Sequence, residues 1–418
     1  MANNKNTKVP NVPNSIDKGN TICNVPALRF PEFSGKWKKV RLGEECNMLC
    51  GYAFNGEDIV EQGSYLLMRG INITEGSIRH SSELDRYYSG SIEKLDKYKL
   101  AVGDLVIGMD GSKVGRNSAI VSSYEDGSYL VQRVCRIKSS IGNNYILQFI
   151  NNTKFHQYVD TVKTSSAIPH ISLRDIQNYR ISIPPTQNET DKIAKLFLLI
   201  DERIATQNKI IEDLKKLKSA IIEEHYKHTQ KQNACVADLG VPFNVGNLSK
   251  EELSETGTSC VIYGELFTTY GEIINHVESH TNKLDGMTLS KKGDLLFPSS
   301  TTVDALSLIA PSAINVDNVI LGGDMFGIHI NSGFNAQYLS YYFNHLAKKQ
   351  FAKHAKGSTI IHLHYKDIEK AQLLLPCLVE QNKMAACLVL LDEKIRIESS
   401  HLQSVVKQKM YLLHQMFI

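Results

Sequence analysis

The segment Gly111-Ser112-Lys113-Val114-Gly115-Arg116-Asn117 combines glycines with two cationic side chains and an amide. Cationic groups on a loop can pair with phosphate, and arginine also matches the acceptor atoms of guanine. The glycines and the lysine are wrongly spaced for the phosphate loop of nucleotide hydrolases. Lys113, Arg116 and Asn117 are therefore candidates for contacting a nucleic acid. An ordinary solvated turn is an equally good interpretation.

A second polar set lies upstream, where Arg69 and Asn72 flank Gly70. An asparagine amide can make paired hydrogen bonds to adenine in the major groove. Asparagine also caps turns through hydrogen bonds to nearby backbone. The pattern thus leaves two interpretations, a base-reading pair or a local cap.

The elements that must position such residues occur twice in the chain. Leu199-Ile200-Asp201-Glu202 returns as Leu390-Leu391-Asp392-Glu393, 191 residues later (392 − 201), and Ile168-Pro169-His170-Ile171-Ser172 returns as Ile360-Ile361-His362-Leu363-His364. A repeat this long is a whole domain plus a helix, because solenoids and propellers have much shorter periods. Two similar units on one frame suit a partner that itself has two half-sites.

Both copies carry a polar loop after a predicted helix. Hydroxyls, backbone amides and a basic neighbour there predict a phosphate clamp, favoured over an ordinary polar loop because both copies keep it. Glycine, which tolerates positive φ, occurs in the second loop only, so a shared loop geometry is not expected. The clamp candidates are Lys163, Thr164 and Ser165 in the first copy and Lys353, Lys356, Gly357 and Ser358 in the second.

The second copy also offers hydroxyl and aromatic side chains between two predicted strands. They are candidate readers of a nucleic acid, although packing in the core is a strong competing interpretation for both tyrosines. These candidates are Tyr263, Thr268, Thr269 and Tyr270.

Two segments have the apolar spacing of long helices. After Pro184-Pro185 a helix is predicted over 188–227, and its repeat follows Pro376. Apolar residues step by three and four alternately, which is the seam of helices packed on each other. A wide amphipathic face is the alternative. The predicted seam consists of Ile193, Phe197, Ile200, Ile204, Ile211 and Leu214 in one helix and Met384, Leu388, Leu391, Ile395, Leu402 and Val405 in the other.

The predicted seam is polar at matching places. Gln207 corresponds to Glu398, and Lys218 corresponds to Lys409. A polar residue in a helix seam costs stability but can specify register. If the two helices are antiparallel, Gln207 should face Glu398.

Short β-branched and aromatic runs punctuated by glycine predict strands over about 40–185 and again over about 236–376. One helix is expected within each stretch, over 145–158 and 337–356. The fold class is therefore α/β (α+β), a two-fold pseudo-repeat. The predicted divisions are a disordered leader over 1–25, a globular domain over 26–185, a helix over 186–230, a second globular domain over 231–376 and a second helix over 377–418.

Composition narrows the class of protein. A net charge of +3 on 418 residues is too small for a non-specific nucleic-acid coat, so any such surface must be local. The eight cysteines are scattered, which argues against zinc or a disulfide framework. No apolar run approaches the roughly 20 residues of a membrane span, and no signal peptide is visible. A cytoplasmic location is expected.

Several segments, in this order, resemble the specificity subunits of type I restriction-modification systems. They are residues 25–33, 42–44 with 51–54, 239–240, 262–272 and, most specifically, Gly357-Ser358-Thr359-Ile360 running into 362–368. The resemblance implies two target recognition domains, over 26–185 and 231–376, each reading one half of a split site in double-stranded DNA. The two helices would form an antiparallel coiled coil whose length sets the gap between half-sites.

The resemblance also implies partners. Two methyltransferase subunits would dock on the chain, joined in a restricting complex by motor and endonuclease subunits. S-adenosylmethionine, ATP and Mg would be bound by those partners, with no cofactor, metal or catalytic residue in this chain. The apolar segment 411–418 is unsuited to a free surface, so it would either dock a partner or close the helix pair.

Two other classes of protein are weighed against this one. A solitary DNA methyltransferase or nuclease is disfavoured because Ile183-Pro184-Pro185-Thr186 lacks the Asn and the aromatic residue of an amino-methyltransferase tetrad. A glycine-rich cofactor loop after a strand is missing as well. The other alternative is a non-catalytic coiled-coil adaptor whose domains bind protein. The salt dependence of binding distinguishes the adaptor from a DNA-binding subunit. DNA affinity falls steeply as salt rises because phosphate contacts release counterions, whereas binding to a protein need not.

Overall fold

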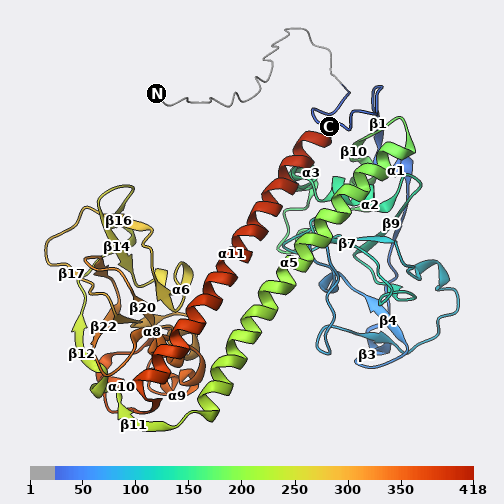
Figure 1. The fold of residues 1–418 in the computed structure, drawn as a ribbon. Helices are drawn as coiled ribbons and strands as arrows, with labels where there is room; N and C mark the ends of the chain where they lie inside the picture. Colours follow the sequence, from blue (N-terminus) through green and yellow to red (C-terminus); the bar gives the residue numbers. More distant parts are fainter. Residues whose placement is uncertain (1–23) are drawn as a thin grey trace, which may run out of the picture. The chain divides into compact units, whose positions relative to one another are not determined.

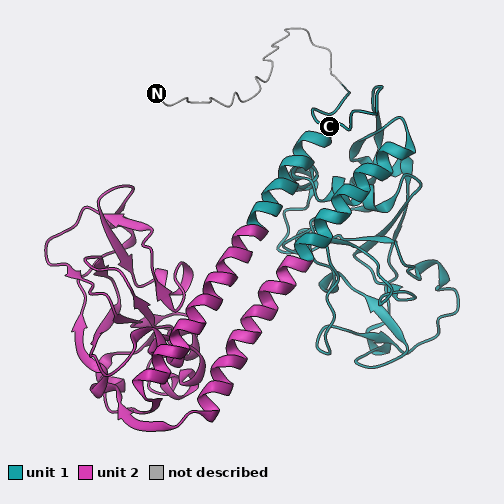
Figure 2. Cartoon of the chain, viewed as in Figure 1, with its two compact units in different colours: residues 1–205, 403–418 teal, residues 206–402 magenta. Residues whose placement is uncertain are grey.

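Two compact units make up the computed structural model, which describes residues 24–418 (Figures 1 and 2). One unit runs to residue 205 and takes in 403–418, and the other covers 206–402. Each long helix is therefore shared between the units. The predicted leader, except Asn24 and Val25, lies outside the described residues. We call residues 38–183 head 1 and residues 231–376 head 2.

The same sheets form in both heads. Head 1 has a four-stranded sheet of order β2-β9-β6-β7, and head 2 has β12-β22-β18-β20 with β15 added at the edge. A parallel pair follows in each, β4 with β8 and β14 with β21. The strands of head 1 are β1 (Lys38–Arg41), β2 (Cys46–Cys50), β3 (Ile59–Val60), β4 (Tyr65–Met68), β5 (Tyr87–Tyr88), β6 (Leu105–Gly108), β7 (Ser118–Ile120), β8 (Tyr129–Leu130), β9 (Val134–Ser139) and β10 (Arg180–Ile183).

The central strands β6 and β18 are buried along their whole length because both faces of their sheet are covered. Leu105 and Ile107 point into one core cluster of head 1, and Val106 points into another. The strands of head 2 are β11 (Lys231–Cys235), β12 (Gly240–Asn244), β13 (Leu253–Ser254), β14 (Thr258–Ile262), β15 (Ile273–Ile274), β16 (Ser279–Thr281), β17 (Thr288–Leu289), β18 (Asp294–Pro298), β19 (Ser300–Thr301), β20 (Ser312–Ile314), β21 (Ile320–Gly322), β22 (Met325–Ile330), β23 (Ile361–His362) and β24 (Gln372–Pro376).

A two-stranded ladder closes each head. β1 pairs with β10 so that Val40 lies opposite Ile181, and β11 pairs with β24 so that Gln232 lies opposite Leu375. The first and last strands of a head are thus held together by backbone hydrogen bonds as well as by the helices.

The short helices differ from prediction. The expected helix over 145–158 is two helices, because the side chain of Asn152 accepts a hydrogen bond from the Lys154 amide and begins a new one. The expected helix over 337–356 is interrupted by a π turn at Tyr342–Leu346. The α-helices within the heads are α1 (Leu42–Glu45), α2 (Asn143–Ile150), α3 (Thr153–Val162), α4 (Leu173–Asn178), α6 (Glu265–Thr268), α7 (Ala305–Leu308), α8 (Ala336–Tyr341), α9 (Lys348–Ala352) and α10 (Tyr365–Ile368).

Two long helices, α5 (Gln187–His228) and α11 (Leu378–Met416), carry the heads, close to the predicted bounds. Their contacts run antiparallel. Within residues 206–402, the Gln207 amide donates to the carbonyl of Glu398 at 3.3 Å and also to its carboxylate, while His225 pairs with Glu380 at 3.2 Å. The prediction that Gln207 faces Glu398 is confirmed.

One ion pair between the helices occurs twice. Lys218 Nζ lies 2.7 Å from Asp392 Oδ1, and Lys409 Nζ lies 2.6 Å from Asp201 Oδ1. Both the lysines and the aspartates are 191 residues apart in sequence (409 − 218 and 392 − 201). The repeat therefore duplicates a cross-helix contact, one copy in each unit.

The residues of the predicted seam are buried or half-buried, and several pack into the heads as well. Ile193 and Phe197 belong to the main core of head 1, and Met384 and Leu388 belong to that of head 2. Ile211 and Val405 are buried, whereas Ile200, Ile204, Leu214, Leu391, Ile395 and Leu402 are half-buried.

The C-terminal segment lies in the core of head 1. Leu413, Met416 and Phe417 are buried there, and the Leu28 amide donates to the Gln415 carbonyl at 3.0 Å. Of the two interpretations of the apolar segment 411–418, intramolecular packing is the one observed, although Tyr411 and His414 are exposed.

The segment 24–37 is held against the start of α5 by a buried carboxylate. Arg29 donates to both oxygens of Glu189 at 2.7 Å, and the Trp37 indole donates to the same group at 3.3 Å. Glu189 is fully buried, so these donors compensate its charge.

Among residues 24–418, no helix is both long and apolar enough to span a bilayer.

In head 2 the Lys218 pair is extended by Glu272. This carboxylate accepts from Lys218 and from His345, each at 2.9 Å. Burial opposes ionisation of Glu272, but the His345 hydrogen bond and the Lys218 charge outweigh it and lower the pKa to about 2, from the ordinary 4.5. Ionised Glu272 is therefore a stabilising group of this unit.

We expect this carboxyl to make stability depend on pH. Because its folded pKa lies below its unfolded value, its contribution is present above about pH 4.5 and is lost as the pH falls towards about 2. The loss should be about 3 kcal/mol in free energy of unfolding. Urea unfolding at pH 6, 4 and 3 of the wild type and of Glu272→Gln measures it. The difference in stability between the two proteins should shrink with falling pH; a constant difference would contradict the assignment.

Candidate nucleic-acid interface

A glycine follows a parallel strand at the same place in each head. Arg69-Gly70 follows β4 and opens the 3₁₀ turn η2 (Gly70–Asn72), and Tyr263-Gly264 follows β14 and leads into α6. The loops after β6 and β18 are equivalent as well. Asp110 forms an antiparallel β-bridge with His170 in head 1, and Ser300 is the antiparallel strand partner of His362 in head 2. In both heads a cavity lies between this glycine turn and this loop.

The cavity of head 1 has a volume of about 440 Å³ and a mixed charge. Lys113 pairs with Glu75 at 3.1 Å, and both side chains are more than half exposed, so water screens the pair. The ammonium can therefore exchange this carboxylate for another anion at little cost. The lining consists of Gly70, Ile71, Ile73, Thr74, Arg79, Asp110, Gly111, Ser112, Lys113 and Asn117.

Two candidates from distant segments meet at one carboxylate. Arg116, from the loop after β6, lies 2.8 Å from Asp160, and Lys163, which caps the end of α3, lies 2.6 Å from the same residue. The hydrogen bond from Lys163, opposed by slight desolvation and aided by the Arg116 charge, lowers the pKa of Asp160. Two cations thus share one anion, which leaves a net positive surface suited to a phosphate.

Asn72 corrects the sequence-based expectation of a base-reading pair. It is 1% exposed, and its amide donates to Asp85 at 3.1 Å and to the Arg79 carbonyl at 3.2 Å. Its oxygen accepts from the Arg69 amide at 3.4 Å. Asn72 is therefore the turn cap, and a base cannot reach it. Arg69 is half-buried, with its guanidinium 3.4 Å from the Leu84 carbonyl.

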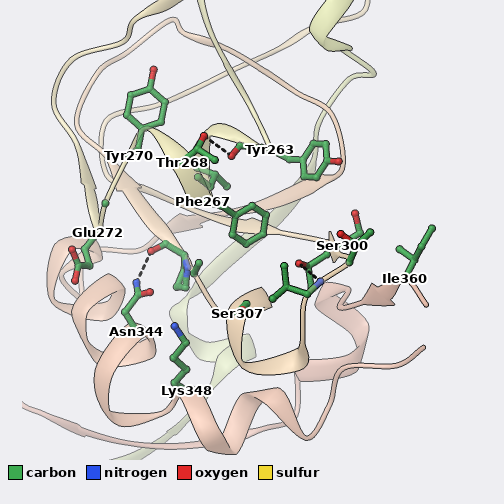
Figure 3. A pocket seen from close by; sticks show the side chains of 18 residues that line it. Tyr263, Phe267, Thr268, Tyr270, Glu272, Ser300, Ser307, Asn344, Lys348 and Ile360 are labelled. Atoms are coloured by element: carbon green, nitrogen blue, oxygen red, sulfur yellow. Dashed lines mark hydrogen bonds between the residues drawn. The ribbon is translucent and has the colours of Figure 1, made fainter. Parts of the chain in front are cut away.

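The cavity of head 2 is larger, about 720 Å³, and its character is apolar and hydroxylic (Figure 3). Phe267 lies in its middle, with Ser300 and Lys348 on the opposite sides (Figure 3). Tyr263 and Phe267 are each 37% exposed. The lining consists of Tyr263, Gly264, Leu266, Phe267, Thr268, Tyr270, Gly271, Glu272, Ser300, Thr301, Thr302, Val303, Ser307, Ala310, Pro311, Asn344, Lys348 and Ile360.

The candidates from 263–270 separate in the structure. Tyr263, Thr268 and Tyr270 line the cavity, whereas Thr269 is exposed outside its lining. Tyr270 packs against a core cluster, and its hydroxyl accepts from the Glu278 amide at 3.0 Å. The competing interpretation of core packing thus describes Tyr270 and does not describe Tyr263.

The two clamp loops share one hydrogen bond and then diverge. The Thr164 amide donates to the His170 carbonyl at 3.0 Å, and the Lys356 amide donates to that of His362 at 2.9 Å. Gly357 has φ +119°, and a Cβ there would lie 2.0 Å from the Ile360 carbonyl oxygen. Only glycine fits that turn, which agrees with the expected difference between the loops.

The polar groups of the clamp loops point outward or are already paired. Ser165, Lys353 and Ser358 are exposed. Lys356 pairs with Asp367, and the Thr164 hydroxyl lies 3.0 Å from His170 Nδ1. In head 2 the loop reaches the cavity through Ile360 alone.

Sequence reasoning missed Phe267, the run Ser300-Thr301-Thr302 and Lys348. The repeat could have identified residues 300–302. Gly293-Asp294 is equivalent to Gly103-Asp104, at a shift of 190 residues (294 − 104). Extending that alignment by six residues places Ser300 opposite Asp110. Lys348 had no such signal, since it arrives from α9, far along the chain.

Comparisons with known proteins agree on one family. The family described as "Type I restriction modification DNA specificity domain" matches residues 34–216 and 236–408. The EcoAI specificity subunit of Escherichia coli is 30% identical over 179 residues, which are 42% of this chain and 29% of that protein. The MjaVIII specificity subunit of Methanocaldococcus jannaschii is 22% identical over 275 residues, 60% of this chain and 64% of that protein. These matches span less than two thirds of either relative.

Solved structures show the same fold. The S subunit of a type I restriction-modification system from M. genitalium superposes with a TM-score of 0.63 at 15% identity, covering 94% of this chain and 99% of that one. With two family matches that together take in most of the sequence, the chain belongs to the type I restriction modification DNA specificity domain family.

Proposed function

We propose that this chain is the DNA-specificity subunit of a type I restriction-modification complex, with each head reading one half of a bipartite site in double-stranded DNA. One observation carries the proposal beyond family membership. The two heads have a cavity at the same topological place, but its lining is polar with mixed charge in head 1 and mostly apolar and hydroxylic in head 2. A duplicated scaffold with different surfaces is what reading two different half-sites requires.

The helix pair would hold the heads and dock partners. Its outer faces carry exposed apolar side chains, of which Leu199 and Leu390 occupy equivalent positions of the repeat. Equivalent patches would suit two copies of one methyltransferase subunit, to which motor and endonuclease subunits would add in a restricting complex. The exposed apolar residues of the helices are Leu198, Leu199, Ile210 and Leu217 on α5 and Val379, Leu390, Ile397, Val406, Met410 and Tyr411 on α11.

In this proposal the chain binds and positions, and its partners catalyse. S-adenosylmethionine, ATP and Mg would belong to those partners, and the complex would work on cytoplasmic DNA. The first test is methylation-aware sequencing of the host genome with this chain present or deleted. Loss of adenine methylation at a split motif supports the proposal. Unchanged methylation beside an active partner methyltransferase would refute it and favour the protein-binding adaptor.

Charge removal in head 1 should weaken DNA binding in a salt-dependent way. We expect Arg116→Ala to lower affinity and to reduce the slope of log K against log salt by about 0.9, because one phosphate contact is lost. Fluorescence anisotropy with duplex DNA at 50–200 mM salt measures both quantities. Lys216→Ala is the matched control, since Lys216 is exposed on α5 and pairs with Glu212 on the same helix. An unchanged slope in Arg116→Ala would exclude a phosphate contact by this residue.

A further inference from the structure

Two cysteines of head 1 face each other across adjacent strands. Cys50 on β2 is the register partner of Cys135 on β9. The Gly51 amide donates to the Val134 carbonyl at 2.9 Å, so the backbone hydrogen bonds flank the cysteine pair and do not join it. Opposed residues at such a position have Cα atoms about 4.5 Å apart. A disulfide spans Cα separations of about 4.4 to 6.8 Å, so this pair can be bridged without moving the strands.

The other cysteines of residues 24–418 have no such partner. Cys46 lies opposite Ser139 in the same ladder, Cys235 lies opposite Gln372, and Cys260 lies opposite Ser279 and Ile320. In head 2 the residues at the place of Cys50 and Cys135 are Asn244 and Phe326. Any chemistry of this pair is therefore confined to head 1.

The two cysteines differ in solvent exposure and in the pKa of their thiols. Cys135 is fully buried, whereas Cys50 is half-buried. The hydrogen bond from Cys135, against the opposing effect of burial, lowers the pKa of Cys50 to about 7, and the same contact raises that of Cys135. Thiolates are the reactive form of cysteine, so Cys50 is the thiol that an oxidant in solvent meets first.

We propose that Cys50 and Cys135 form a peroxide-sensitive thiol pair that closes to a disulfide within head 1. The Cys50 thiolate attacks hydrogen peroxide, the O–O bond breaks, and the leaving hydroxide takes a proton to become water. Cys135 then attacks Sγ of the Cys50 sulfenic acid, the S–O bond breaks, and a second water leaves. Two thiols and one peroxide thus give one disulfide and two waters, and a dithiol reductant returns the disulfide to two thiols while becoming a disulfide itself.

The disulfide would act on the sheet beneath the head 1 cavity. Cys50 Sγ lies 3.7 Å from the Met109 sulfur, and Met109 is followed directly by Asp110 and the cavity loop. A covalent link between β2 and β9 suppresses opening of the ladder that supports this loop. The inference stands independently of DNA binding, since it concerns the chain alone.

Peroxide treatment of the full chain, followed by alkylation of the remaining thiols in denaturant and peptide mass spectrometry, tests the proposal. We expect a Cys50–Cys135 linked peptide, a fall from 8 free thiols to 6, and full recovery with dithiothreitol. Hydrogen exchange of β2 and β9 amides should slow at least tenfold in the oxidised chain. Cys135→Ala should abolish the linked peptide and slow oxidation of Cys50, because the hydrogen bond that lowers its pKa is lost, and Cys46→Ser should oxidise like the wild type.

Two results would overturn the proposal. One is survival of both thiols under conditions that oxidise the exposed Cys377 and Cys387. The other is a linked peptide in which Cys50 is joined to a different cysteine or to a second chain. If Cys135→Ala fails to fold, the wild-type peptide map still decides between these outcomes.

Discussion

Replacing Lys218 by alanine is expected to lower the free energy of unfolding by about 3–5 kcal/mol. Lys218 is 6% exposed, and its ammonium lies 2.9 Å from Glu272 and 2.7 Å from Asp392. Removing it leaves two carboxylates close together with no cation between them. The ammonium also lies 4.8 Å from the centre of the Tyr341 ring, a contact that alanine cannot make.

Its repeat partner supplies a matched control. Lys409 is 16% exposed at its side chain and pairs with Asp201. Lys409→Ala should therefore cost less, about 1–2 kcal/mol, because a single carboxylate with more access to water is left. Urea unfolding of both variants at pH 7 measures the difference. Equal losses would mean that the half-buried Glu272 adds nothing to the network.

Replacing Phe417 by alanine is expected to cost about 3–5 kcal/mol, the usual range for a buried phenylalanine. The ring is 2% exposed, and its centre lies 4.8 Å from that of Phe149 and 5.5 Å from those of Tyr145 and Phe197. These partners come from α2 and α5, so the side chain joins head 1 to the ends of both long helices.

Tyr411→Ala is the control for this prediction. Tyr411 lies on α11, six residues before Phe417, but is 62% exposed, so its removal should change stability by no more than about 0.5 kcal/mol. Thermal and urea unfolding compare the two variants. A loss below 1 kcal/mol for Phe417→Ala would show that the segment 411–418 contributes little to the core of head 1.

The sequence alone determined the repeat and the two long helices, and it predicted the contact between Gln207 and Glu398 on the condition that the helices are antiparallel. These features are readable because helical periodicity depends on residues three and four positions apart, and because equivalent residues of a duplicated antiparallel pair meet where the two copies cross. The alternation of apolar runs and glycine likewise indicated strands in both heads. The apolar periodicity did not predict the break at Asn152 or the π turn. A helix cap depends on local hydrogen bonds, and the periodicity of apolar residues does not report them.

Only the tertiary structure decided which polar residues remain available to a ligand. Asn72 and Arg116 look alike as candidates in sequence, but Asn72 is buried against Asp85 whereas Arg116 meets Lys163 at a surface carboxylate. The head 2 cavity joins α6, the loop after β18 and α9, and the core of head 1 includes Phe417 from the other end of the chain. Burial and pairing of this kind arise from contacts between separate segments of the chain, and no local pattern encodes them.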